Sequence, residues 1–364
     1  MAHNRCDAVS GPAMSADLIA GIRRDRLAAF AAREAETYIK ARPKAAKALK
    51  DGAGTFLGGV PMHWMADWPM PHLPLVAKAH GARIADIDGQ TLDDFCLGDT
   101  GSMFGHSPAP VARAIRAQAR RGLTYMLPTE AALTAGRLLT DRFGPFRWQI
   151  ATTATDANRF ALRVARAITG RPRVLVFNGC YHGTLDDTFV SLENGRTVNT
   201  PGLLGQVNDL TQTAVACEFN DLAGVEAALA QGDVAAILTE PVMTNSCMVL
   251  PEAGFHDGLR QLSLKYGALL IMDETHTISS GLGGYTRVHS LRPDIFVVGK
   301  CVAGGMPTAV WGLTEGTAQR YHQADAKREP GRTGMGTTLS ANPMQFACLV
   351  ATLFYGIGAS YTKR

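Results

Sequence analysis

The fold is decided by the stretch ALLIMDETHTISSGLGGYTRVHSLRPDIFVVGKCVAGGMP, residues 268–307. It contains two apolar runs, ALLIM and IFVV, and each has the pattern of a strand that is buried on both faces. The first run ends in the acids Asp273 and Glu274, and the second leads through a glycine to Lys300. Neighbouring parallel strands end at one edge of a sheet, where open α/β folds bind ligands. We therefore expect an anion and a cation side by side at that edge.

Lys300 is a lone cation between a buried strand and the glycine-rich run CVAGGMP. Burial disfavours the ammonium form, so a lysine in this place loses its proton easily, as a Schiff-base lysine must. Taken alone, such a lysine more often extends its charged end to the surface. The acid Asp273, at the end of the preceding strand, favours a catalytic role for Lys300 over this structural one.

The run from Asp273 to Pro307 resembles the core of class III aminotransferases, which are pyridoxal 5'-phosphate enzymes of fold type I. This group includes glutamate-1-semialdehyde aminomutases and ω-amino-acid transaminases, and the resemblance extends from about Gly58 to about Thr352. It implies an α/β fold with a mostly parallel, seven-stranded sheet covered by helices, and an incomplete small domain. It also implies that Lys300 forms the Schiff base with the cofactor. Asp273 would hold the protonated pyridine nitrogen, which keeps the ring an effective electron sink.

The same resemblance assigns the residues that hold the phosphate and the ring. Thr153, Ala154 and Thr155 match a serine, a glycine and a threonine of the family's phosphate-binding loop, at the start of a helix that can bind an anion. An ordinary capped helix is the alternative. Tyr181 matches the aromatic residue that stacks on the ring, and His182 follows it.

Four further positions complete the predicted cofactor site. Glu240 would lie below the edge of the cofactor, unless it is a solvated acid at a strand end. Thr275 stands where the family usually has a valine on the second face of the ring. His276 is a partner of Asp273, a proton donor, or an ordinary hydrogen-bonded histidine. Thr338 would reach the phosphate bound to a neighbouring subunit, which implies a homodimer.

The substrate is less well defined by the sequence. In some relatives that act on β-amino acids, an arginine in the aromatic N-terminal segment binds the carboxylate. The corresponding stretch here is PMHW, which ends in Trp64 and has no arginine. We assign Trp64 and Met103 as candidate substrate contacts.

The composition argues against several other classes of protein. The 364 residues carry a formal net charge of +4 without a Lys/Arg block, so we expect no nucleic acid partner. No apolar stretch is long enough to span a bilayer, and we expect a cytoplasmic protein without a membrane partner. The seven cysteines are scattered without a CxxC pair, which indicates neither disulfides nor a metal site. We expect them to be reduced and mostly buried, with Cys301 a small core residue.

The chain alternates strands and helices after an N-terminal region. We expect N-terminal helices over residues 1–50, and an irregular segment and hairpin of the small domain over residues 51–106, with the turn at Asp88-Gly89. The large cofactor-binding domain would follow over residues 107–345, and residues 346–364 would begin a truncated C-terminal region. Strands are predicted at 173–178, 235–241, 268–274 and 295–300, and helices after Ser107-Pro108 and at 129–142, 156–168, 221–230 and 254–266.

The leading functional hypothesis is a transaminase that moves an amino group between an amine or amino-acid donor and a carbonyl acceptor. An intramolecular 2,1-aminomutase is an alternative on the same fold. A non-catalytic, truncated protein that only binds the cofactor is a third possibility. We expect a homodimer that binds pyridoxal 5'-phosphate and turns over slowly.

Overall fold

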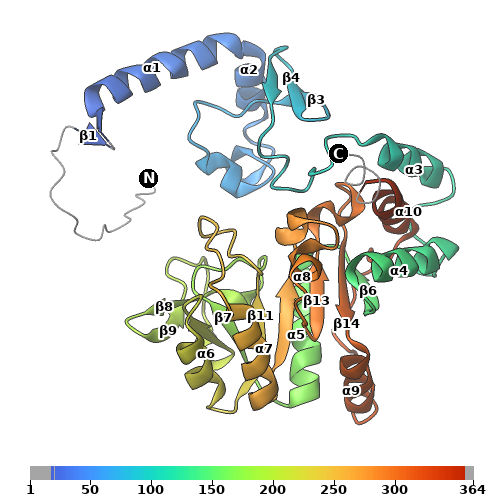
Figure 1. The fold of residues 1–364 in the computed structure, drawn as a ribbon. Helices are drawn as coiled ribbons and strands as arrows, with labels where there is room; N and C mark the ends of the chain where they lie inside the picture. The colour runs from blue at the N-terminus through green and yellow to red at the C-terminus, as the bar shows by residue number, and fades with distance from the viewer. Residues whose placement is uncertain (1–17, 20, 357–364) are drawn as a thin grey trace. The chain divides into compact units, whose positions relative to one another are not determined.

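The computed structural model describes residues 18–19 and 21–356, which divide into two compact units at the junction of Phe95 and Cys96 (Figure 1). Sequence-based expectations for residues 1–17, Cys6 included, and for residues 357–364 lie outside the described part. The four-part division expected from the sequence stays a prediction. In the described part, no helix is long and apolar enough to span a membrane.

The described part of the N-terminal unit begins with a pair of short strands, continues with helices and ends in a small sheet. A buried ion pair joins the helical part to the small sheet, because Arg42 Nε donates to Asp86 Oδ2 at 3.0 Å. The expected irregular segment contains only short 3-10 turns. The elements are β1 (Leu18–Ile19), β2 (Ile22–Arg23), α1 (Arg24–Ala41), α2 (Pro43–Gly52), η1 (Leu57–Gly59), η2 (His63–Asp67), β3 (Val76–His80), β4 (Arg83–Asp86) and β5 (Thr91–Asp93).

The predicted hairpin around Asp88-Gly89 is confirmed as the β4–β5 pair. Gly89 has a φ of 88°, which a glycine adopts without strain. Asp86 Oδ1 accepts from the backbone N–H of Asp88 at 3.1 Å and of Gln90 at 2.8 Å, which fixes the turn. The structure adds a second turn at Gly81, so that β3 pairs antiparallel with β4 and the hairpin becomes a three-stranded sheet.

The second unit is built on a seven-stranded sheet with the order β10-β7-β11-β12-β13-β14-β6 (Figure 1). All neighbouring pairs from β10 to β13 are parallel, and β14 pairs antiparallel with both β13 and β6. The expected mostly parallel sheet is thus confirmed. The strands are β6 (Arg147–Ala151), β7 (Arg173–Phe177), β10 (Ala214–Cys217), β11 (Val234–Thr239), β12 (Leu269–Asp273), β13 (Ile295–Val298) and β14 (Ala309–Leu313), and a separate hairpin pairs β8 (Val190–Glu193) with β9 (Arg196–Asn199).

Helices cover both faces of this sheet. Along β7, Val174 and Val176 point into a core shared with helix α5, whereas Leu175 and Phe177 point into a core shared with α6 and α7. Because both faces are buried, the strands read as continuous apolar runs rather than as alternating ones. The helices are α3 (Ala109–Ala119), α4 (Glu130–Phe143), α5 (Ala154–Thr169), α6 (Leu222–Leu229), α7 (Phe255–Tyr266), α8 (Gly284–Val288), α9 (Glu315–Asp325) and α10 (Pro343–Ala351), with 3-10 turns η3 (Asp186–Thr188), η4 (Leu210–Gln212), η5 (Thr277–Ser280) and η6 (Lys300–Ala303) and the π-helical turn η7 (Thr352–Gly356).

The four predicted strands and five predicted helices of this unit are present, but three strands of the seven-stranded sheet and both strands of the β8–β9 hairpin were missed. The three strands of the sheet are β6, β10 and β14, whose short sequences RWQIA, AVAC and AVWGL carry little periodicity. Thr129 occupies the N-cap position of α4, but its hydroxyl makes no capping bond and is buried without a partner.

The cysteines are less buried than expected. Six of the seven lie in the described part and none is in a disulfide, but Cys96 and Cys247 are exposed. Cys301 is a buried core residue, as predicted, and burial raises the pKa of its thiol to about 12.

Candidate active site

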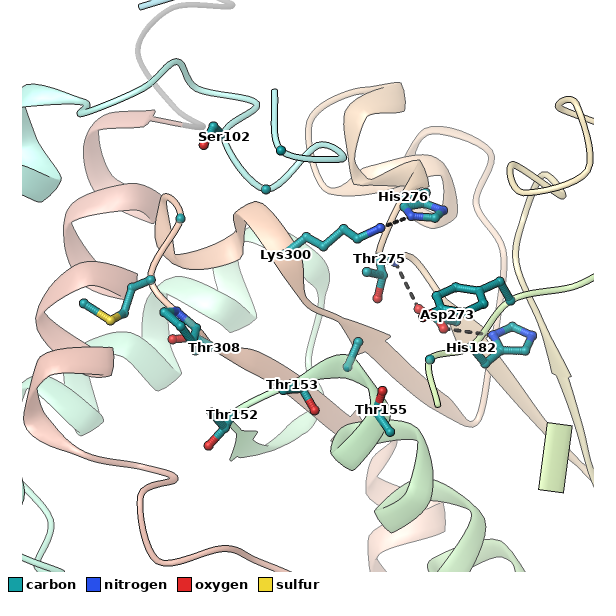
Figure 2. A pocket seen from close by; sticks show the side chains of 18 of the residues that line it. Ser102, Thr152, Thr153, Thr155, His182, Asp273, Thr275, His276, Lys300 and Thr308 are labelled. Atoms are coloured by element: carbon teal, nitrogen blue, oxygen red, sulfur yellow. Dashed lines mark hydrogen bonds and ion pairs between the residues drawn. The ribbon is translucent and has the colours of Figure 1, made fainter. Parts of the chain in front are cut away.

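A cavity of about 440 Å³ opens where strands β11, β12 and β13 end and helix α5 begins (Figure 2). It lies wholly within the second unit. The strands β12 and β13 are adjacent and parallel, with Asp273 opposite Val297. Asp273 and Lys300 both line the cavity, so the two charged strand ends predicted from the sequence lie at one site.

Asp273 is held in place by three donors. Its Oδ2 accepts from His182 Nδ1 at 2.9 Å and from Asn158 Nδ2 at 2.8 Å, and its Oδ1 accepts from the backbone N–H of Thr275 at 3.1 Å. The side chains of Asp273 and His182 are almost completely buried. A buried carboxylate is tolerable only when it is paired and hydrogen-bonded, and here both conditions are met.

The pKa shifts of Asp273 and His182 are both those expected for an ion pair. Burial raises the pKa of Asp273, but the hydrogen bonds from His182, Thr275 and Asn158 outweigh it, and the pKa lies below its ordinary value. Burial lowers the pKa of His182, but the Cys180 sulfur and the Asp273 carboxylate outweigh it, and the pKa lies well above its ordinary value. The site therefore holds an ionised carboxylate against a protonated imidazole.

Lys300 extends from the end of β13 into the cavity and carries a positive φ of 48° (Figure 2). Its Nζ donates to Asp99 Oδ2 at 2.6 Å and also contacts His276 Nε2. A non-glycine residue in the left-handed region is held there by its surroundings, and such positions gather at functional sites. The amine thus points away from the core and towards polar partners.

The polar partners of the His276 ring are Lys300 at Nε2 and Thr244 at Nδ1, and Asp273 is not among them. Nδ1 contacts the hydroxyl of Thr244, and this hydroxyl donates to Glu240 Oε2 at 2.6 Å. Glu240 is buried, with only 3% of its side chain exposed, so it is not the solvated acid of the alternative interpretation. The other oxygen of its carboxylate, Oε1, has no hydrogen-bond partner.

Helix α5 starts at the floor of the cavity. Thr153 is its N-cap, and the side chain accepts from the backbone N–H of Asp156 at 3.2 Å. The first N–H groups of a helix lack intrahelical acceptors and favour a bound anion. Ala154 lies in the first helical turn, so replacing the family's glycine causes no backbone strain there. Gly183 approaches this turn so closely that an added Cβ would lie 2.0 Å from Thr155 Oγ1.

Two buried hydroxyl groups in the cavity wall have no partner. They are Thr275 Oγ1 and Thr308 Oγ1. Buried polar groups are nearly always satisfied, so these hydroxyls fit a wall that a polar ligand completes. A buried carboxylate, a lysine amine and an anion-binding helix start are the groups that pyridoxal 5'-phosphate requires. The residues present therefore fit this cofactor.

Most of the predicted site residues come together here. The cavity is lined by Thr153, Ala154, Thr155, Tyr181, His182, Glu240, Asp273, Thr275, His276 and Lys300. Thr338 is exposed and does not line the cavity. Met103 lines a different cavity, beside Val111 and Tyr355. Trp64 belongs to the N-terminal unit, so its role stays a prediction.

Sequence reasoning missed several residues of the site. Among them, Asn158, Thr244, Asp99 and Thr308 touch or line it. Asn158 carried a signal, since it is fully buried on an otherwise apolar helix face and a buried amide needs partners. Thr244 and Asp99 lie in loops whose sequences carry no such signal.

Comparison with known proteins agrees with the fold. The sequence matches the family described as Aminotransferase class-III over residues 65–355. A curated glutamate-1-semialdehyde 2,1-aminomutase from Desulfitobacterium hafniense is 34% identical over 283 residues, which cover 76% of this chain and 64% of that protein. The chain thus spans somewhat less than two thirds of the length of this relative.

Solved structures give the same result. A crystal structure of a glutamate-1-semialdehyde aminomutase from Pseudomonas aeruginosa superposes with a TM-score of 0.89 at 46% identity, covering 93% of this chain and 76% of that one. An ω-transaminase from Sphaerobacter thermophilus has a TM-score of 0.78 at 29% identity, covering 85% of this chain and 72% of that one.

The fold is that of the fold type I pyridoxal-phosphate transferases. The chain belongs to the class III aminotransferase family. Class III aminotransferases use pyridoxal 5'-phosphate, so the cofactor expected from the sequence is that of the family.

Proposed function

We propose that this chain catalyses amino-group transfer with pyridoxal 5'-phosphate, between an amine or amino-acid donor and a carbonyl acceptor. The observation that carries the proposal is the meeting of Lys300 and the ionised Asp273 in one cavity, at the ends of adjacent parallel strands. Each residue alone has an ordinary structural explanation. Together they supply an amine and a buried anion, which this cofactor chemistry requires.

The residues have distinct tasks in this proposal. Lys300 would hold the cofactor covalently through Nζ, and the freed amine would then move a proton at the substrate carbon. Asp273 would keep a proton on the ring nitrogen, since its carboxylate is ionised and held by three donors. When bound, the cofactor supplies an electron sink for charge that develops beside the amino group.

The remaining residues would bind and orient. The start of α5, with Thr153 and Thr155, would bind the phosphate. Tyr181 lines the cavity and is 41% exposed, so its ring is available for stacking. Thr275 presents a hydroxyl where the family usually has a valine, which keeps the β-branched shape and adds a donor.

An intramolecular 2,1-aminomutase is the second candidate. The relatives at 34% and 46% identity are named glutamate-1-semialdehyde aminomutases, which favours it. Both candidates use the same amine and the same buried carboxylate, so the cavity does not distinguish them. The substrates that the protein converts distinguish them. Conversion of glutamate 1-semialdehyde without any added acceptor supports the aminomutase, whereas turnover only with a separate amine and carbonyl compound supports the transaminase.

The covalent role of Lys300 has a direct test. Borohydride reduction of the protein with bound pyridoxal phosphate, followed by peptide mapping, should place the pyridoxyl label on Lys300. The Lys300→Ala variant should lose the label and the visible absorbance band. Lys265→Ala is the matched control, because Lys265 is an exposed lysine paired with Glu226. A label on Lys265 or Lys327 in the unsubstituted protein would contradict the assignment.

We also propose that the functional unit is a homodimer in which Thr338 contacts the phosphate bound to the second subunit. Its exposed position outside the cavity wall is compatible with this role. Light scattering of the cofactor-bound protein should give the mass of a dimer. A stable monomer that binds the cofactor tightly would contradict the proposal. Contacts of Trp64 and Met103 with the substrate, and a cytoplasmic location, stay predictions of the sequence.

A further inference from the structure

A chain of hydrogen bonds leads from the Lys300 amine to a buried carboxylate. Lys300 Nζ contacts His276 Nε2, His276 Nδ1 contacts Thr244 Oγ1, and Thr244 Oγ1 lies 2.6 Å from Glu240 Oε2. The same oxygen of Glu240 also accepts from the backbone N–H of Thr244 at 3.3 Å. Figure 2 shows the first contact of the chain, where the Lys300 side chain reaches the ring of His276.

The two ends of this chain fix the direction of every bond in it. A lysine ammonium can only donate, and an ionised carboxylate can only accept. Thr244 therefore donates its hydroxyl hydrogen to Glu240, and its oxygen accepts from His276 Nδ1. The neutral imidazole must carry its proton on Nδ1, and the lone pair of Nε2 faces the ammonium of Lys300.

We propose that His276 is the proton partner of Lys300 in the amino-transfer reaction, and that Thr244 and Glu240 position its ring for this task. In the step itself, an N–H bond of the Lys300 ammonium breaks and its electron pair stays on Nζ. The lone pair of His276 Nε2 forms the new N–H bond. Lys300 is left as a neutral, nucleophilic amine, and the proton returns by the reverse path. This inference rests on the proposed function, because it concerns the same amine.

Two carboxylates lie beside the Lys300–His276 pair. Glu240 Oε2 lies 3.5 Å from Nδ1, and Asp99 Oδ2 lies 3.8 Å from Nε2. Asp99 also pairs with Lys300 at 2.6 Å. The positive charge therefore has an anionic neighbour whichever of the two side chains carries it. The ring is 13% exposed, so water is largely excluded from the transfer path.

The tautomer can be tested without any cofactor. Nitrogen NMR spectra of the cofactor-free protein labelled with ¹⁵N-histidine should show neutral His276 with the proton on Nδ1. The signals are assigned by their loss in His276→Gln. In Thr244→Val, which removes the hydroxyl and keeps the branched shape, the Nδ1–H preference should weaken. Neutral His276 with its proton on Nε2 would overturn the inference, since that nitrogen could not accept from Lys300.

The transfer itself is tested by the pH dependence of cofactor attachment. Pyridoxal phosphate is added to the cofactor-free protein, and the rate at which a borohydride-reducible label appears on Lys300 is measured by mass spectrometry. At about pH 7, His276→Gln should slow attachment about 100-fold. This deficit should shrink as the pH rises towards the ordinary pKa of a lysine, about 10.4, because the amine then loses its proton to solvent.

A purely structural role gives a different result. If glutamine only disturbed the site, attachment would slow by the same factor at every pH, and that outcome overturns the inference, as does an unchanged rate. Thr244→Val should show a smaller deficit with the same pH dependence, because it loosens the ring without removing it. His289→Gln, an exposed histidine stacked on Tyr285, is the control and should leave the rate unchanged.

The same experiments separate this inference from the proposed function. A label on another lysine in the unsubstituted protein refutes the covalent role of Lys300. It also refutes proton transfer from Lys300 to His276 as a step of the reaction, because that step depends on the covalent role. A label on Lys300 together with a deficit that does not vary with pH refutes only the proton role.

Discussion

Replacing Asp273 by asparagine should destabilise the cofactor-free protein and abolish the ion pair with His182. Asparagine has the same shape, and its amide oxygen can still accept from His182 and Asn158 in place of Oδ2. Its NH₂ group then faces the N–H of Thr275, and that hydrogen bond is lost. Removing one partner of a buried ion pair costs about 3 to 5 kcal/mol, and the retained acceptor puts the expected loss at about 3 kcal/mol.

The loss of folding stability in Asp273→Asn should depend on pH, because the pKa values of Asp273 and His182 are both shifted in the folded protein. The pKa of Asp273 is lowered in the folded state, so its contribution is present above the unfolded value of about 3.9 and is lost as the pH falls through the folded value. The pKa of His182 is raised, so its contribution is complete below the unfolded value of about 6.5 and is lost as the pH rises through the folded value. The variant should therefore differ most from the unsubstituted protein between about pH 4 and 6.5.

Thermal unfolding followed by circular dichroism measures this effect. For a domain of this size each kcal/mol shifts Tm by about 2 to 4 °C, so Asp273→Asn should lower Tm by about 6 to 12 °C. Glu226→Gln removes an exposed partner of Lys265 and should leave Tm unchanged. A Tm of Asp273→Asn equal to that of the control at pH 6 would refute the reasoning that an ionised Asp273 stabilises this site. Under the proposed function, the variant should also bind some cofactor and lose turnover by several orders of magnitude.

Two further predictions concern packing. Gly183→Ala should cost about 2 to 5 kcal/mol in the free energy of unfolding, because Gly183 has a φ of 87° and the new Cβ would meet Thr155 Oγ1. Gly195→Ala has a similar φ of 74° with open space around it and should cost only about 1 to 2 kcal/mol, and equal losses for the two would contradict the steric argument. Cys301 and Cys348 should resist alkylation at pH 8 until the protein unfolds, because burial raises the pKa of their thiols to about 12 and about 11, and peptide mapping that finds either labelled in the folded protein would show this to be wrong.

Local patterns in the sequence were enough to predict the strands that carry the proposed chemistry. The apolar runs before Asp273 and Lys300 are continuous because their strands are covered on both faces. Burial of this kind favours an apolar side chain at every position of the strand. The turn at Asp88-Gly89 was equally visible, because a positive φ restricts the residue type. In each case the physical constraint acts on neighbouring residues, so the sequence shows it directly.

The partners of these residues were decided by tertiary structure. Asn158 meets Asp273 across 115 positions of the sequence, and Asp99 meets Lys300 across 201. His276 was open to three interpretations, and its ring lies against Lys300 and Thr244 rather than Asp273. Such contacts depend on the angle at which a loop leaves a strand and on which helix packs beside it. Periodicity carries no information about either, since a side chain's own residue type does not fix what the folded chain brings next to it.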